Sequence, residues 1–209
     1  MIRGYYFITD SGLSISGNLS DVEQALRAKT SVVQYRSKNA STRDFYNDAL
    51  TARRICRNAT FLINDRVDIA LAVGADGVHL GQSDLPYEIA RELLGKDKII
   101  GLTVHSVKDA IAAQEKSANY IGVSPVFPTT TKSDAGDSLG IEGLKKIREQ
   151  VSLPIVAIGG INLSNALSVI QAGADAVCAI SAVVTKPDVC AEVEKFQALF
   201  TIKSDSGSR

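Results

Sequence analysis

Two aspartates follow short apolar segments of this chain. Asp65 comes directly after the segment 61–64, and Asp84 comes shortly after the segment 77–80. Two carboxylates at neighbouring strand ends repel each other unless a cation lies between them or one of them takes up a proton. Mg²⁺ is commonly bound by one or two carboxylates, with water and substrate phosphate completing its shell. We therefore predict a magnesium site at Asp65 and Asp84; two ordinary loop aspartates are the alternative.

A third apolar segment ends in basic residues. Gln34, Arg36 and Lys38 occupy alternate positions, and alternate side chains of a strand point to one face. Arg and Lys at a strand end are often merely solvated, but three aligned polar groups on an inward face are unfavourable unless they meet a ligand. The guanidinium fork matches phosphate oxygens, and the ammonium group adds a point charge. This pattern predicts a diphosphate site beside the metal.

Three later segments could bind a second anion or close the site. The loop 127–140 is long for a compact domain, which is typical of a functional or a disordered segment; we predict a lid that supplies the hydroxyls of Thr129–Thr131 and the cation of Lys132. Gly159–Gly160 and Ser181 follow the last two apolar segments, where barrels often bind phosphate. A glycine pair can also simply form a tight turn. A second anion site implies two phosphorylated substrates.

These residues share one rim if the apolar segments are strands of a (β/α)₈ barrel. Short, almost wholly apolar segments alternate with amphipathic ones, as in parallel sheets covered on both faces. We predict strands at 5–9, 31–35, 60–63, 77–80, 99–102, 120–123, 155–158 and 176–180. Predicted helices span 21–28, 41–57, 67–73, 86–94, 106–117, 141–151, 163–172 and 189–200. The repeated Gly-Ala-Asp sequences at 74–76 and 173–175 fit helix ends.

This pattern predicts a single-domain α/β protein, a (β/α)₈ TIM barrel over residues 1–202, followed by a disordered tail at 203–209. An open doubly wound sheet is the alternative fold. His79 is expected in the middle of a strand and His105 just beyond another, and we interpret both as packed, hydrogen-bonded residues rather than catalytic ones.

Composition excludes several classes of function. The 23 basic and 23 acidic residues give zero formal net charge, and no basic stretch is interleaved with aromatics, so nucleic acid is not an expected partner. The three cysteines are widely spaced and lack a CxxC pair, which predicts reduced thiols. No apolar run of about eighteen residues and no secretory h-region occurs. We expect a cytoplasmic protein without membrane contact, either monomeric or a homo-oligomer.

The chain resembles the thiamine-phosphate synthase family over nearly its whole length. The resemblance is carried by five motifs in order: Gln34–Lys38, Asn64–Arg66, Gly77–Asp84, Pro125–Lys132 and Ala157–Ile161. It implies a (β/α)₈ barrel that couples a hydroxymethylpyrimidine diphosphate to a thiazole phosphate, giving thiamine phosphate and diphosphate with Mg²⁺. Carbon dioxide would also leave if the thiazole is carboxylated.

The resemblance also implies residue roles. Catalytic roles would fall to Arg36, Lys38, Thr103 and Lys132, and metal binding to Asp65 and Asp84. The pyrimidine diphosphate would be held by Gln34, Tyr35, Arg36, Ser37, Lys38, Asn64, Thr103 and Lys132, and the thiazole phosphate by Thr129, Thr130, Thr131, Gly159, Gly160, Ile180 and Ser181.

Two positions depart from the family pattern, and two other functions compete with it. The family usually has Ser where this chain has Thr103, which keeps the hydroxyl, and Gly where it has Ser124. A related thiazole tautomerase shares the fold but needs no diphosphate clamp, so the acidic pair and the basic trio argue against it. A non-catalytic sensor of phosphorylated ligands is the rival outside the enzymes.

Overall fold

The backbone closes into a barrel of eight parallel strands. The structure is a computed structural model that describes residues 2–129, 131 and 136–206. Neighbours in sequence pair with each other, and the last strand pairs with the first. The strands are β1 (Gly4–Ile8), β2 (Val32–Tyr35), β3 (Thr60–Asn64), β4 (Gly77–Leu80), β5 (Ile99–Val104), β6 (Tyr120–Val123), β7 (Ile155–Ile158) and β8 (Ala176–Cys178).

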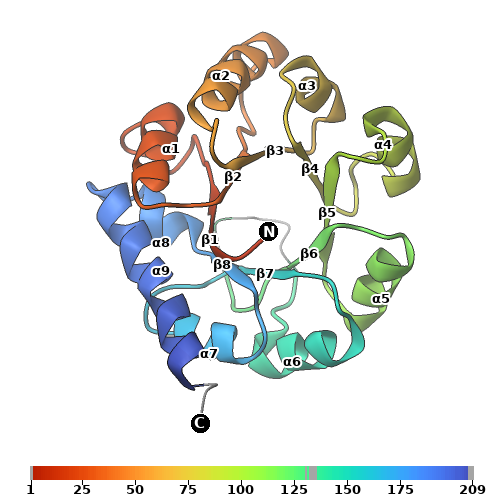
Figure 1. The fold of residues 1–209 in the computed structure, drawn as a ribbon, viewed down its shortest axis with the longest axis vertical. Coiled ribbons are helices and arrows are strands. Elements are labelled where there is room, and N and C mark those ends of the chain that lie inside the picture. Colours follow the sequence, from red (N-terminus) through yellow and green to blue (C-terminus); the bar gives the residue numbers. More distant parts are fainter. Residues whose placement is uncertain (1, 130, 132–135, 207–209) are drawn as a thin grey trace.

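An outer ring of helices covers the strands (Figure 1). These helices are α1 (Asn18–Arg27), α2 (Thr42–Ile55), α3 (Val67–Ala72), α4 (Tyr87–Leu94), α5 (Val107–Glu115), α6 (Gly140–Gln150), α7 (Ala166–Gln171), α8 (Ile180–Val184) and α9 (Val189–Ser206). The predicted barrel is therefore confirmed, and the open doubly wound sheet is wrong because β1 pairs with both β2 and β8.

One predicted strand boundary was wrong. The last strand was expected to reach Ile180, but β8 ends at Cys178 and Ile180 begins the short helix α8. Helix α9 runs through Ser206, and the last three residues of the predicted tail lie outside the described residues.

Strand alternation divides the buried side chains into two layers. On β1, Tyr5 and Phe7 belong to the large cluster between the strands and the helices. Tyr6 and Ile8, at the intervening positions, belong to a smaller cluster inside the barrel. Because alternate residues point to opposite faces of a strand, the inward positions of every strand converge on the barrel axis. These inward positions lead directly to the site.

The two Gly-Ala-Asp repeats link helices to the strands that follow them. Gly74 and Gly173 follow α3 and α7 with φ of 64° and 109°, the left-handed region that glycine enters readily. Asp76 and Asp175 then accept hydrogen bonds from backbone N–H groups of β3 and β7, at 2.8 and 2.9 Å. The prediction that these glycines end helices is confirmed.

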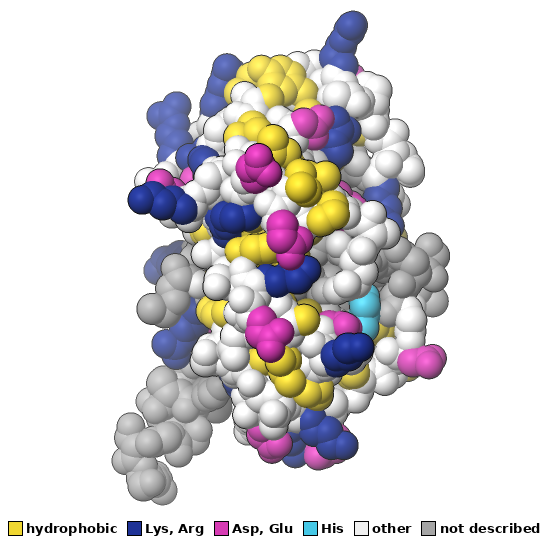
Figure 2. All heavy atoms as spheres, turned by 90° about the vertical axis from the view of Figure 1, so that its right-hand side faces the viewer, with side chains coloured by type: hydrophobic (Ala, Val, Ile, Leu, Met, Phe, Trp, Pro, Cys, Tyr) yellow, Lys and Arg dark blue, Asp and Glu magenta, His cyan; other side chains and the backbone are white. Residues whose placement is uncertain are grey.

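The outer surface carries interspersed charges. On the face shown in Figure 2, hydrophobic side chains lie between basic and acidic ones rather than beside a patch of one sign. No described helix has the length and apolar character needed to cross a membrane. All three cysteines are free, as predicted; Cys56 and Cys178 are buried, and Cys190 is partly exposed.

Candidate active site

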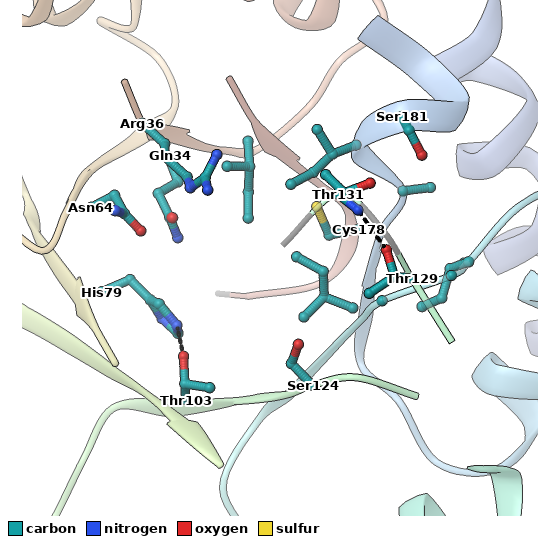
Figure 3. Close-up of a pocket in the computed structure, with 17 residues that line it drawn as sticks. Gln34, Arg36, Asn64, His79, Thr103, Ser124, Thr129, Thr131, Cys178 and Ser181 are labelled. Atoms are coloured by element: carbon teal, nitrogen blue, oxygen red, sulfur yellow. Dashed lines mark hydrogen bonds between the residues drawn. The ribbon is translucent and has the colours of Figure 1, made fainter. Parts of the chain in front are cut away.

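Inward-facing polar residues meet at the carboxyl ends of the strands, where they line a cavity. In Figure 3, Gln34, Arg36, Asn64, His79 and Thr103 lie on one side of it, and Thr129, Thr131 and Ser181 lie on the other. The wall between them is largely apolar and includes Ile8, Ile158 and Cys178. The cavity therefore has two polar ends joined by an apolar middle.

A second cavity adjoins the first. Both share Arg36, Asn64, His79 and Thr103, and the second adds Lys38, Asp65, Gln82, Ser83, Asp84 and His105, together with Gly81. This arrangement brings the predicted acidic pair and the predicted basic residues to one rim.

The acidic pair is close enough to interact. Burial, and then the neighbouring Asp84 carboxyl, raise the pKa of Asp65 to about 7, while Asn64 and Arg36 partly oppose the rise. Asp65 has a φ of 62°, a conformation that Asp and Asn tolerate better than most residues. Asp84 is held by the backbone N–H of Gly81, which donates to its Oδ2 at 2.6 Å. The site therefore places an acid of raised pKa where a cation would stabilise both carboxylates.

The Asp65 carboxyl should make the stability of the metal-free protein depend on pH. Its folded pKa lies above the unfolded value of about 4, so the folded state binds the extra proton and loses stability as pH rises from about 4 through 7. Asp65→Asn should therefore raise the Tm in EDTA at pH 8 by about 3 °C, a value reduced for partial exposure. At pH 4 this charge-dependent gain should vanish.

Thermal unfolding at both pH values measures the effect. Asp97→Asn, in the exposed turn before β5, is the matched control for loss of one negative charge. If Asp65→Asn raised the Tm equally at pH 4 and pH 8, the backbone conformation of residue 65, and not its charge, would be responsible.

The Arg36 guanidinium is held in place before any ligand binds. Its Nη1 lies 2.6 Å from Asp10 Oδ2, and both side chains are only 11% exposed. The Thr9 hydroxyl accepts from the Arg36 backbone N–H at 2.7 Å and donates to its carbonyl at 2.8 Å. Lys38, two residues further on, is exposed at the rim. The two cations thus differ, one preorganised and one in contact with solvent.

The opposite end of the cavity is built from backbone turns and hydroxyls. Gly159 and Gly160 have φ of 99° and 62°, and a Cβ on either would press against the segment 125–128 at 2.6 Å. The tight-turn interpretation of this pair is therefore correct, and the turn also lines the cavity. Ser181, on the first turn of α8, is exposed to the same space. The loop residue Thr131 approaches through its N–H, which donates to the Thr129 hydroxyl at 3.2 Å.

Two predicted site residues that the structure describes, Tyr35 and Ser37, do not contribute side chains to these cavities. Tyr35 points outward because it alternates with Gln34; its hydroxyl donates to Asp48 at 3.0 Å and its ring packs edge-on against Phe45. The Ser37 hydroxyl faces Ser11, outside the site. Thr130 and Lys132 lie outside the described residues. Any contact of Tyr35 with a ligand would have to come from its backbone.

Several residues of the site were missed at the sequence level. His79 was predicted to be a packed, hydrogen-bonded residue, and its bonds to Tyr120 and Thr103 confirm this. It was not counted among the site residues, but it lines both cavities. Asp10 and Ile8 were also missed. Strand alternation could have identified two of them. Phe7 and Val78 face the helices, so their neighbours Ile8 and His79 must face the barrel interior. Ser124, a departure from the family pattern, lines the cavity, and its carbonyl accepts from His105 Nδ1.

Fold and site together define an enzyme of the (β/α)₈ barrel class. Such enzymes build their sites from the loops after the strands, and here a carboxylate pair, two cations and an apolar pocket meet at that end. The profile of the family described as "Thiamine monophosphate synthase" matches residues 5–183. The chain belongs to this family and is an enzyme of thiamine phosphate formation.

Individual relatives agree with the family profile. The thiamine-phosphate synthase of Methanosarcina barkeri is 51% identical over 193 residues, covering 92% of this chain and 88% of the relative. That of Chloroflexus aurantiacus is 46% identical over 203 residues, covering 96% and 94%. The solved thiamine phosphate pyrophosphorylase of Pyrococcus furiosus superposes with a TM-score of 0.89 at 42% identity, covering 96% of each chain.

Proposed function

We propose that this enzyme couples a hydroxymethylpyrimidine diphosphate to a thiazole phosphate, with Mg²⁺ bound at Asp65 and Asp84. The observation that carries the proposal is the continuity of the two cavities. Carboxylates and cations line one end, an apolar wall follows, and hydroxyls with a glycine turn line the other end. The two substrates together present the same order: the diphosphate matches the charged end, the two flat heterocycles match the apolar wall, and the phosphate of the thiazole matches the hydroxyl end.

The acidic pair fits a magnesium ion. The described residues contain no group of three or more His, Cys, Asp or Glu side chains that could hold a metal, so the protein would offer two carboxylates and leave places for water and diphosphate oxygens, as Mg²⁺ commonly requires. When bound, Mg²⁺ would neutralise negative charge on the departing diphosphate. Burial, and then the Asp84 carboxyl, raise the pKa of Asp65, and a cation beside the pair would offset both by favouring the charged carboxylate.

The remaining steps fall to side chains of the protein. The bond between the pyrimidine methylene carbon and the diphosphate oxygen breaks, the electron pair leaves with diphosphate, and the thiazole nitrogen then forms the new bond to carbon. Arg36 and Lys38 would stabilise the leaving charge, and we assign Lys132 the same role. Ile8, Ile158 and Cys178 would exclude water from the cationic carbon. This chemistry requires no general base.

The end lined by Ser181 and the glycine turn would bind the thiazole phosphate. We assign its phosphate to the Ser181 hydroxyl and to backbone N–H groups near Gly160 and Ile180, with Thr129, Thr130 and Thr131 closing over it. The exposed hydroxyl of Ser181 and the glycine turn at residues 159–160, which both line the cavity, support this assignment. We propose the same end for the carboxylated thiazole, which would lose carbon dioxide during the reaction.

Ser181→Ala should raise the KM for thiazole phosphate about tenfold and leave kcat nearly unchanged, because it removes one hydrogen bond to a charged group in both ground and transition states. Steady-state kinetics with the pyrimidine diphosphate saturating measures this effect. Ser168→Ala, which removes an exposed hydroxyl of α7 that bonds to a backbone carbonyl, is the control. A fall in kcat with an unaltered KM would contradict the assignment.

One incubation separates the proposed function from its rivals. Purified protein is mixed with both phosphorylated heterocycles, with Mg²⁺ or with EDTA, and diphosphate and thiamine phosphate are measured. Equal amounts of both products, formed only with Mg²⁺, are expected. Metal-independent aromatisation of the thiazole without coupling would instead identify a tautomerase, and binding of both substrates without diphosphate release would identify a sensor.

A further inference from the structure

A line of hydrogen bonds crosses the interior of the barrel. Gln34 Nε2 donates to the Tyr6 hydroxyl at 2.8 Å, and the hydroxyls of Tyr6 and Tyr120 lie 2.7 Å apart. The Tyr120 hydroxyl lies 2.9 Å from His79 Nδ1, and His79 Nε2 lies 2.9 Å from the Thr103 hydroxyl. These five side chains come from five different strands. We call them the interior hydrogen-bond chain; it ends at the cavity wall, where Thr103 and His79 are drawn in Figure 3.

Counting protons gives the chain a direction. The Tyr6 oxygen accepts from Gln34, and among the described residues its one remaining recorded partner is Tyr120. Tyr6 therefore donates to Tyr120, and Tyr120 donates in turn to His79 Nδ1. In the reverse direction the buried Tyr6 proton would have no acceptor among these residues, which is unfavourable. Burial raises the pKa of Tyr6 and of Tyr120, so both phenols keep their protons.

We propose that His79 is a positioning residue that makes Thr103 a hydrogen-bond donor to the pyrimidine ring. With Nδ1 accepting from Tyr120, the imidazole proton lies on Nε2 and is donated to the Thr103 oxygen. The Thr103 proton is then directed away from His79 and into the cavity. There it selects a ligand that presents an acceptor lone pair, such as a pyrimidine ring nitrogen, over one that presents a donor.

Close packing holds the rings of this chain in place. A Cβ at Gly101 of β5 would lie 2.1 Å from the ring of Tyr120, and a Cβ at Gly122 of β6 would lie 2.9 Å from that of His79. The two rings also pack against each other, with centroids 5.4 Å apart. Thr103 is itself only 7% exposed, and its β-branched side chain has few χ1 states. The direction of the Thr103 hydroxyl is therefore set by the barrel interior rather than by solvent.

This inference rests on the proposed function in one respect, the binding of the pyrimidine beside Thr103. The direction of the chain itself can be measured without any substrate. The sequence contains two histidines, so a long-range ¹H–¹⁵N spectrum of the protein contains two imidazoles. His105 Nδ1 meets a backbone carbonyl, which can only accept. His105 should therefore carry its proton on Nδ1, and His79 should carry its proton on Nε2.

The spectrum is recorded at pH 8 on ligand-free protein, where an ordinary imidazole is neutral. His79→Gln removes one set of signals and so assigns both histidines. Tyr120→Phe removes the donor to Nδ1 and should turn the single Nε2–H form of His79 into a mixture of the two tautomers. Tyr87→Phe, which removes a buried hydroxyl bonded to the Ser117 carbonyl outside the site, should leave the His79 signals unchanged.

Kinetics tests whether the chain acts on the pyrimidine alone. Tyr120→Phe should lower kcat/KM for the pyrimidine diphosphate about tenfold, the loss expected for one misdirected hydrogen bond, and leave the KM for thiazole phosphate within about twofold. A merely structural effect would alter both substrates alike, and Tyr87→Phe should alter neither.

Two substitutions of His79 provide a rescue pair. The side-chain nitrogen of Gln reaches about as far from the backbone as Nε2, whereas that of Asn reaches about as far as Nδ1. His79→Gln can therefore still donate to Thr103, and it should retain about ten times more kcat/KM for the pyrimidine diphosphate than His79→Asn. Equal activity of the two variants would contradict the positioning role.

The outcomes also distinguish this inference from the proposed function. An Nδ1–H tautomer for His79 in wild-type protein that forms thiamine phosphate would overturn the inference and leave the function intact. A wild-type protein that shows the Nε2–H tautomer without any coupling would overturn the function and, with it, the role assigned to Thr103. If Tyr120→Phe kept a single His79 tautomer and full activity, the interior hydrogen-bond chain would not be what sets the direction of the Thr103 hydroxyl.

Discussion

Asp65→Asn should lower kcat for coupling by at least about 100-fold at saturating substrates and saturating Mg²⁺. The substitution keeps the size of the side chain and removes its charge, and Asn tolerates the φ of 62° at this position. Metal stabilisation of leaving-group charge is worth several kcal/mol, and about 1.4 kcal/mol corresponds to a factor of ten in rate. Diphosphate release measures the loss.

The Asp68→Asn variant is the control for Asp65→Asn. Asp68 lies three residues away on the exposed surface of α3, where it pairs with Arg66, so its loss should leave kcat within about twofold of wild type. Calorimetry measures the affinity for Mg²⁺ in the presence of the pyrimidine diphosphate. This affinity should fall in Asp65→Asn and stay at the wild-type value in Asp68→Asn. Wild-type kcat in that variant would mean that the metal is bound elsewhere.

The second large effect is expected from Arg36→Lys, which should lower kcat/KM for the pyrimidine diphosphate about 100-fold. Lysine keeps the charge but loses the planar fork that bonds two phosphate oxygens at once. It would also lose the preorganisation that the 2.6 Å contact with Asp10 gives to the guanidinium. A hydrogen bond to a charged group contributes about 1.5–3 kcal/mol, so one lost bond accounts for roughly this factor.

A matched arginine outside the site makes the Arg36→Lys comparison specific. Arg53 also contacts a carboxylate through both Nη atoms, at 3.3 and 3.2 Å from Asp76, but it lies on α2 away from both cavities. Arg53→Lys should lower Tm slightly and leave the kinetic constants unchanged. If Arg36→Lys were as active as Arg53→Lys, charge alone would suffice and the fork would have no role.

The sequence alone determined the barrel and the side of it that carries the site. Eight apolar segments separated by amphipathic ones indicate buried parallel strands, because both faces of such strands must be covered. Alternation along β2 and into the residue that follows it correctly directed Gln34 and Arg36 inward. It also contained the information that Tyr35 points outward, which the family resemblance alone did not provide. Local periodicity is encoded in neighbouring residues, so it can be read without coordinates.

Only the tertiary structure decided which residues from distant strands meet. Asp10 and Arg36 come from loops after β1 and β2, and their ion pair depends on how those loops fold over the barrel. The pKa of Asp65 depends on burial and on Asp84, 19 positions away in sequence. Tyr6, Tyr120 and His79 look like ordinary core residues until barrel closure brings their polar atoms into line. Contacts of this kind depend on strand register and closure, which no local pattern in a sequence specifies.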